Sequence, residues 1–129
     1  MILVDTSFLI DFFRGVESTK NLIQEESATT AISYHEIMTG LKRKRASEEE
    51  RFFRRFFGQT RVLSYDTRAA DESSEIASKL MAVGREVNTL DILIAGIAAA
   101  NGITKILTSD SDFREIAKVT NLDVITYRR

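Results

Sequence analysis

The sequence contains no cysteine and only one histidine, His35, among its 129 residues. Without cysteine there can be no disulfide, no thiolate nucleophile and no zinc site built on thiolates, and a cytoplasmic location is the natural expectation. One histidine cannot build a histidine-rich metal site, and it disfavours a Ser-His-Asp triad. Catalysis by this chain would therefore have to rely on other groups, such as carboxylates and hydroxyls.

Long apolar segments are also absent. No stretch of about 18 apolar residues occurs, as a membrane-spanning helix would need, and the first apolar run is short and is interrupted by Asp5, unlike a signal peptide. Apolar residues nevertheless make up 43% of the chain, which is too many for a disordered segment. With no repeat, linker or low-complexity segment, the chain is expected to form one domain over residues 1–129.

The net charge of −1 argues weakly against a general nucleic-acid binder, but the charges are unevenly distributed. Eight basic residues lie between positions 42 and 61, against three glutamates: Lys42, Arg43, Lys44, Arg45, Arg51, Arg54, Arg55 and Arg61. Such a segment could contact phosphate groups, and it could equally form a solvated helix face. Both interpretations stay open at this point.

Segments with strand and helix patterns alternate along the chain. Short apolar runs predict strands at residues 2–4, 28–32, 62–64, 105–107 and 123–126. Helical patterns cover residues 7–13, 18–26, 33–45, 48–57, 67–83, 90–100 and 112–119, and Ser33 with Glu36 has the spacing of a capping box. This alternation predicts an α/β domain with a mainly parallel sheet flanked by helices.

Acidic residues recur where the predicted strands are followed by helices. They follow the first strand, open the helix after the second, open the apolar helix 90–100 and follow the fourth strand: Asp5, Glu36, Asp91 and Asp110, with Asp112 two residues on. The carboxyl ends of parallel strands share one edge of a sheet, where ligands collect. If the first strand is central, with the second and fourth beside it, these acids converge there.

Each of these acids also has a structural interpretation. Asp5 and Asp110 suit turns or helix N-caps, and Glu36 suits the far half of a capping box. For Asp66 we favour the capping role strongly, since the third strand is expected at the edge of the sheet. Asp91 suits the first turn of a helix, where the helix dipole favours an acid. It differs from the others because its helix has hardly any polar face, and a buried acid needs a partner.

Carboxylates that share a pocket repel one another. Two of them about 4 Å apart repel by roughly 4 kcal/mol at an effective dielectric constant of about 20. Several such pairs would be a serious cost for a domain whose stability is on the order of 5–15 kcal/mol. Oxygen ligands suit Mg²⁺ or Mn²⁺, which also bind phosphate oxygens. The expected chemistry is therefore metal-assisted attack of water on a phosphodiester.

Four segments, in order and with compatible spacing, resemble the motifs of PIN-domain ribonucleases: VDTSFLIDFF, SYHEIMTG, VNTLDILIAGIAAANG and ILTSDSDF. The resemblance covers essentially the whole chain and is strongest to the short VapC-type toxins of toxin–antitoxin pairs. It implies a single PIN-like domain with a sheet in the order 3-2-1-4-5, Mg²⁺ or Mn²⁺ as cofactor, and RNA as substrate. It also implies a homodimer and inhibition by a small cognate antitoxin.

The resemblance assigns site residues position by position. The acids that bind metal in the family fall on Asp5, Glu36, Asp91 and Asp110. Supporting positions, expected to orient an acid or a bound water, fall on Thr6, Ser7, Thr108 and Asp112. No acid of the core set is missing, so the resemblance implies an active endoribonuclease.

Two other functional classes remain open. A receiver-like signalling domain would need a phosphoacceptor aspartate after the third strand and a lysine after the fifth. Only Asp66 lies near the first place, and Tyr127, Arg128 and Arg129 follow the last strand. A non-catalytic module could instead bind RNA or a protein through the basic segment, with the acids purely structural.

Aromatic residues cluster on two of the predicted helices. The four on helix 48–57 suit a core or a dimer surface better than base stacking: Phe52, Phe53, Phe56 and Phe57. Together with apolar residues near the start of the chain they exceed what a small core needs: Phe8, Phe12, Phe13 and Ile23. Large apolar patches usually mark interfaces. We expect a homodimer that also receives an antitoxin segment, with Phe12 and Phe13 as first contacts.

Overall fold

The computed structural model describes all of residues 1–129. The strands are β1 (Ile2–Val4), β2 (Ser27–Thr30), β3 (Val62–Leu63), β4 (Lys105–Leu107) and β5 (Asp123–Ile125). The helices are α1 (Thr6–Phe13), α2 (Ala31–Lys44), α3 (Ser47–Gly58), α4 (Thr67–Ala82), α5 (Thr89–Ala100) and α6 (Asp112–Ala117), with a 3₁₀ helix η1 (Glu17–Thr19). The predicted alternation of strands and helices is confirmed.

The five strands form one parallel sheet in the order β3-β2-β1-β4-β5. β1 is central, because Leu3 pairs with Ala28 of β2 on one side and with Ile106 of β4 on the other. The order agrees with the PIN-like expectation. It differs from the order 2-1-3-4-5 of receiver-like domains, so the receiver-like alternative is wrong.

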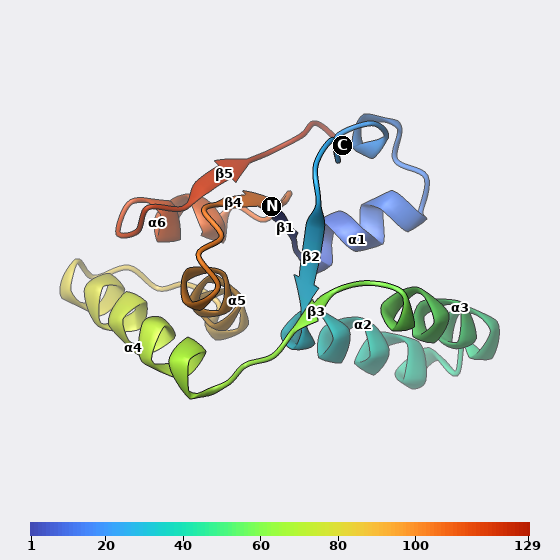
Figure 1. Ribbon diagram of the computed structural model, residues 1–129, viewed down its shortest axis with the longest axis horizontal. Helices are drawn as coiled ribbons and strands as arrows, with labels where there is room; N and C mark the ends of the chain where they lie inside the picture. The colour runs from blue at the N-terminus through green and yellow to red at the C-terminus, as the bar shows by residue number, and fades with distance from the viewer.

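Helices cover both faces of the sheet, and successive side chains of each strand serve opposite faces. Leu3 packs into a core formed with α4, α5 and α6, whereas its neighbours Ile2 and Val4 pack into a second core formed with α1, α2 and α3. Figure 1 shows α4 and α5 on the left of the central strands and α2 and α3 on the right. Both cores are needed to hold the helix starts that follow the strands at one edge.

α5 packs very closely against α4, and Gly96 makes this possible. A Cβ at position 96 would lie 2.5 Å from Ser73 Cβ and 2.7 Å from the Ala69 carbonyl oxygen on α4. Such distances are far inside normal contact, so α5 can take this place only with glycine there. The close packing positions the first turn of α5, where Asp91 lies.

Three predicted boundaries were wrong. The predicted helix 18–26 is only the short turn η1, because the chain turns at Asn21, whose φ of 66° is left-handed and breaks a helix. The predicted strand 28–32 is Ser27–Thr30, and α2 begins at Ala31. Thr30, not Ser33, caps α2, because its hydroxyl accepts a hydrogen bond from the Ser33 N–H. The sequence pattern favoured Ser33 because Glu36 lies three residues later.

The aromatic clusters divide between core and surface. Phe53 and Phe57 are buried, so for these two residues the core interpretation is confirmed. Phe8 is also buried, so its expected place on an interface is wrong. Phe12 and Phe52 are 40% and 49% exposed. Both contact the ring of Phe13 edge-on.

No helix is both long enough and apolar enough to span a membrane.

Candidate active site

Four acids from four separate segments of the chain line one cavity at the carboxyl edge of the sheet. The cavity has a volume of about 280 Å³ and contains Asp5, Glu36, Asp91 and Asp110 in its wall. Its other lining residues are Thr6, Ser7, Ile10, Arg14, Asn88 and Arg129. The structure therefore brings together all four acids that the sequence singled out, while the two arginines were not expected there.

Asp5 is both a helix cap and a member of this cavity. It is the N-cap of α1, where its Oδ1 accepts a hydrogen bond of 2.9 Å from the Phe8 N–H. The hydroxyls of Ser7 and Thr108 donate to the same carboxylate, over 2.9 Å and 2.6 Å. Burial raises the pKa of Asp5 to about 6; these hydrogen bonds oppose the rise, and the charge of Asp110 adds to it. The capping and functional interpretations of Asp5 are thus compatible.

Ser7 and Thr108 connect the ends of β1 and β4. The Ser7 hydroxyl accepts from the Ser109 N–H at 3.0 Å, and the Thr108 hydroxyl accepts from the Asp110 N–H at 2.9 Å. Since each hydroxyl also donates to Asp5, each one fixes a carboxylate and a stretch of backbone together. The two hydroxyls therefore set the position of Asp110 relative to Asp5.

Glu36 enters the cavity from α2. Its Oε1 accepts a hydrogen bond of 2.7 Å from the Thr6 hydroxyl, which also contacts Ser33. Because Thr30 caps the helix, Glu36 does not serve as the far half of a capping box. Its side chain joins the first turn of α1 to the first half of α2. His35, beside it in the sequence, is exposed.

Asp91 is the most perturbed acid of the cavity. It is only 6% exposed, and its Oδ2 is buried without any hydrogen-bond partner. Burial raises the pKa of Asp91 to about 8, with further contributions from the nearby Asp110 carboxyl group and from the charges of Asp5 and Glu36. Asn88, not Asp91, caps α5. A role as a favourable acid in the first turn of α5 therefore leaves the buried Oδ2 of Asp91 unexplained.

Asp112 adds a third carboxylate beside Asp91 and Asp110. One oxygen from each of these three residues lies within 4.8 Å of the others. Asp112 Oδ2 also accepts from the Asn88 N–H at 3.0 Å, while the Asp112 N–H donates to Asp110 Oδ1 at 2.9 Å. Asp112 thereby ties the start of α5 to the start of α6.

The donor set fits a hard divalent cation. All its ligating atoms are carboxylate oxygens, which Mg²⁺ and Mn²⁺ prefer. An unpartnered buried oxygen next to other carboxylates is unfavourable without a cation, and Asp91 Oδ2 is such an atom. The arrangement could thus hold a cation and present it to the open part of the cavity.

Asp66 behaves as expected for a cap. Its side chain accepts a hydrogen bond of 2.9 Å from the Ala69 N–H at the start of α4. It does not line the acidic cavity. The structural interpretation favoured for this residue is confirmed.

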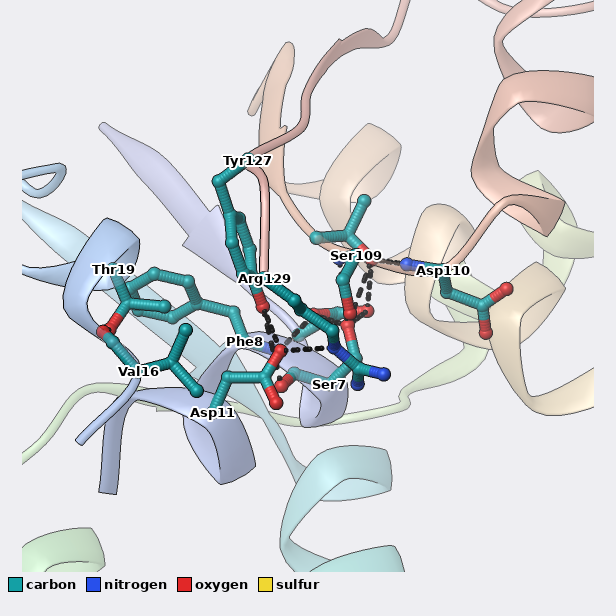
Figure 2. Close-up of polar contacts among 11 residues, drawn as sticks. Ser7, Phe8, Asp11, Val16, Thr19, Ser109, Asp110, Tyr127 and Arg129 are labelled. Atoms are coloured by element: carbon teal, nitrogen blue, oxygen red, sulfur yellow. Dashed lines mark hydrogen bonds and ion pairs between the residues drawn. The ribbon is translucent and has the colours of Figure 1, made fainter. Parts of the chain in front are cut away.

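A second polar cluster beside the cavity was missed. Asp11 of α1 is buried, and its Oδ2 accepts hydrogen bonds from the Tyr127 hydroxyl at 2.7 Å and from Arg129 Nε at 2.9 Å (Figure 2). Burial alone would raise the pKa of Asp11, but the hydrogen bonds from Tyr127 and Arg129 and the charge of Arg129 hold it below the ordinary value. The one sequence signal was an aspartate inside the apolar run LIDFF.

Comparison with known proteins gives a consistent family assignment. The PIN domain family profile matches residues 2–119. Ribonuclease VapC11 of Mycobacterium tuberculosis is 31% identical over 137 aligned positions, covering 99% of this chain and 100% of that protein. The tRNA(fMet)-specific endonuclease VapC of Shigella flexneri is 25% identical and covers 84% and 83% of the two chains. Among solved structures, VapBC2 from Rickettsia felis, bound to a DNA fragment from its promoter, matches with a TM-score of 0.83, 18% identity and coverage of 99% and 100%.

Proposed function

We propose that this chain, which belongs to the PIN domain family, is a Mg²⁺- or Mn²⁺-dependent endoribonuclease that hydrolyses RNA phosphodiester bonds in the cytoplasm. The observation that carries the proposal is the cavity where Asp5, Glu36, Asp91 and Asp110 meet, with Asp91 Oδ2 buried and unpartnered. A full-length relative at 31% identity that is a ribonuclease supports the choice of RNA.

The four acids would hold the cation, and the hydroxyls would hold the acids. When bound, Mg²⁺ or Mn²⁺ supplies Lewis acidity toward phosphate oxygens and makes a coordinated water more acidic. Ser7 and Thr108 keep Asp5 in place, and Thr6 keeps Glu36 in place. Removing a residue that orients a metal ligand typically lowers metal affinity or activity 10- to 100-fold, which corresponds to about 1–3 kcal/mol.

We further propose that the chain is the toxin of a toxin–antitoxin pair and binds a small antitoxin. A groove of about 160 Å³ between α1, α2 and α3 adjoins the acidic cavity, since both are lined by Ile10, Arg14 and Glu36. The rest of its wall combines apolar side chains, among them Phe13 and Phe53, with the charged Lys44 and Glu49. A short apolar segment lying there would end beside the acids. The neighbouring solved structure of a VapBC complex supports this assignment.

A homodimer remains part of the proposal. Phe12 and Phe52 are large, exposed aromatic side chains on adjacent helices, and both pack on Phe13. Burying them would stabilise an interface. Light scattering at tens of micromolar protein tests this: a dimer mass is expected, and a monomer mass would count against the proposal.

RNA cleavage tests the enzymatic proposal. Purified protein is incubated with single-stranded and structured RNA in Mn²⁺, in Mg²⁺ and in excess chelator. We expect cleavage with either metal and none in chelator, and a loss of cleavage in Asp91→Asn but not in the capping control Asp66→Asn. Equal cleavage in chelator, or full activity of Asp91→Asn, would contradict the mechanism. Binding of RNA without any cleavage would favour the non-catalytic alternative.

A further inference from the structure

Two arginines stand among the acids of the cavity, and they differ in how they are held. Arg14 and Arg129 are the cationic residues in its wall. Arg14 is exposed at the C-terminal end of α1 and makes no hydrogen bond through its side chain to the rest of the protein. Arg129 is anchored, because its Nε donates a hydrogen bond of 2.9 Å to Asp11. An anchored guanidinium loses less conformational entropy when it binds a ligand.

The anchor uses only one edge of the guanidinium. Asp11 is 5% exposed at its side chain, whereas the Arg129 side chain is 64% exposed. Figure 2 shows Arg129 Nε facing the Asp11 carboxylate, with the two terminal nitrogens directed away from it. Those nitrogens make no hydrogen bond within the protein. A purely structural ion pair would gain more from a bidentate arrangement, in which two nitrogens face the carboxylate.

The chemistry of the cavity calls for a cationic group of this kind. An RNA phosphate that approaches Asp5, Glu36, Asp91 and Asp110 meets several negative charges, of which a single divalent cation offsets only two. A guanidinium whose two terminal nitrogens are free matches the spacing of two phosphate oxygens. Tyr127 donates to the same Asp11 oxygen from the other side, which fixes the carboxylate that holds Arg129.

We propose that Arg129 binds a backbone phosphate of the RNA at the mouth of the acidic cavity, and that Asp11 is a positioning residue that aims the Arg129 guanidinium at that phosphate. This inference rests on the proposed ribonuclease function, since it assumes that RNA enters the cavity. It adds a substrate-binding residue and its support to a site otherwise composed of acids and hydroxyls.

The test measures RNA binding separately from cleavage. Affinity for a labelled single-stranded oligoribonucleotide is measured in Mn²⁺ across a range of salt concentrations, in an Asp91→Asn background that keeps the RNA intact. Replacing Arg129 by Gln should weaken binding about tenfold and reduce the slope of log affinity against log salt by about 0.7. The RNA affinity of Arg129→Lys should lie between those of the parent and of Arg129→Gln, because lysine keeps the positive charge but cannot donate two parallel hydrogen bonds to a phosphate. Arg128→Gln changes the adjacent residue, which is also exposed, and is the matched control. It should leave both the RNA affinity and the salt slope unchanged.

A double-mutant cycle tests the role of Asp11. Asp11→Asn keeps the size of the side chain and an acceptor for Tyr127, so thermal melts should show a folded protein. We expect it to weaken RNA binding severalfold when Arg129 is present and to have little effect in the Arg129→Gln background. Tyr127→Phe removes the other hydrogen bond to Asp11 and should weaken RNA binding less than Asp11→Asn does, because the Asp11 charge that holds Arg129 remains.

The outcomes separate this inference from the proposed function. If Arg129→Gln binds RNA with the parent affinity and salt slope, or if Asp11→Asn weakens binding equally in both backgrounds, the inference is wrong. Mn²⁺-dependent cleavage by the wild type would still stand in that case. If the wild type binds RNA through Arg129 but never cleaves it with any metal, the proposed function fails and the phosphate contact is supported.

Discussion

Replacing Asp91 with Asn should stabilise the metal-free protein. Burial and the neighbouring acids raise the pKa of Asp91 from 3.8 to about 8. At pH 7 such a shift costs the folded state about 4 kcal/mol relative to the unfolded chain. Asn removes this cost but also removes a charge that is favourable in the first turn of α5, worth about 0.3–1 kcal/mol. Its buried amide keeps part of the desolvation penalty, so we expect a net gain of about 1–3 kcal/mol.

The dependence on pH follows from the same shift. The unfolded chain loses the Asp91 proton near its model value of 3.8, whereas the folded protein keeps it to about pH 8. Between these values the unfolded state binds fewer protons, so the free energy of unfolding of the metal-free wild type falls as pH rises. Asp91→Asn should show a flatter profile over this window. Its advantage should be absent near pH 3 and largest near pH 8.

Thermal melts in chelator and in Mn²⁺ measure these effects. For a domain of this length the expected gain corresponds to a melting temperature higher by about 4–10 °C in chelator. Added Mn²⁺ should stabilise the wild type more than the variant. A ligand stabilises the folded protein more the more tightly it binds, and the variant has lost one of the acids that hold the metal. Asp66→Asn is the control, since Asn caps a helix nearly as well as Asp. If Asp91→Asn melts lower than wild type in chelator and the Mn²⁺ shift is unchanged, the crowded acidic pocket is refuted.

Further changes test the parts that hold the site. Gly96→Ala should destabilise the protein by about 1–3 kcal/mol in urea unfolding, because a Cβ there meets α4 at 2.5 Å; Gly40→Ala, a helical glycine with open space around it, should instead stabilise by about 0.5–1 kcal/mol. Thr108→Val should lower Mn²⁺ affinity about tenfold by calorimetry through the loss of its bond to Asp5, and Thr108→Ser should restore it. Tyr127→Phe should lower stability by about 1–2 kcal/mol, since it leaves a buried carboxylate with one partner fewer.

Local patterns were sufficient to predict an α/β domain with a parallel sheet, because short apolar strands alternate with helical segments. The strand order came from the resemblance to PIN-domain ribonucleases. The apolar run Ile2–Val4 predicts a buried strand, and this strand, β1, forms the centre of the sheet. Boundaries were less well predicted where two signals competed. Thr30 and Ser33 can both cap a helix, and only the observed backbone of Thr30, which is extended, decides between them.

The acids of the site were predictable because parallel strands place their following residues at one edge. Asp91 was the most informative, since a place in the first turn of an otherwise apolar helix does not explain why its carboxyl group is buried without a partner. Asp11 and Arg129 could not be predicted this way, because they lie 118 positions apart and meet only in the folded chain. Arg129 carries no local pattern that distinguishes it from an ordinary surface charge, and the only signal at Asp11 is its place in the apolar run LIDFF.

The most direct test of the central claim is a Mn²⁺ titration in which RNA cleavage and Mn²⁺ occupancy are followed together, occupancy by electron paramagnetic resonance. If Asp5, Glu36, Asp91 and Asp110 hold the cation on which cleavage depends, rate and occupancy should rise at the same Mn²⁺ concentration in the wild type. In Asp91→Asn, occupancy should require Mn²⁺ concentrations at least about tenfold higher, and cleavage should be absent at the concentrations that saturate the wild type. Cleavage that is complete while the site is empty, or Mn²⁺ occupancy that is identical in wild type and Asp91→Asn, would contradict the claim.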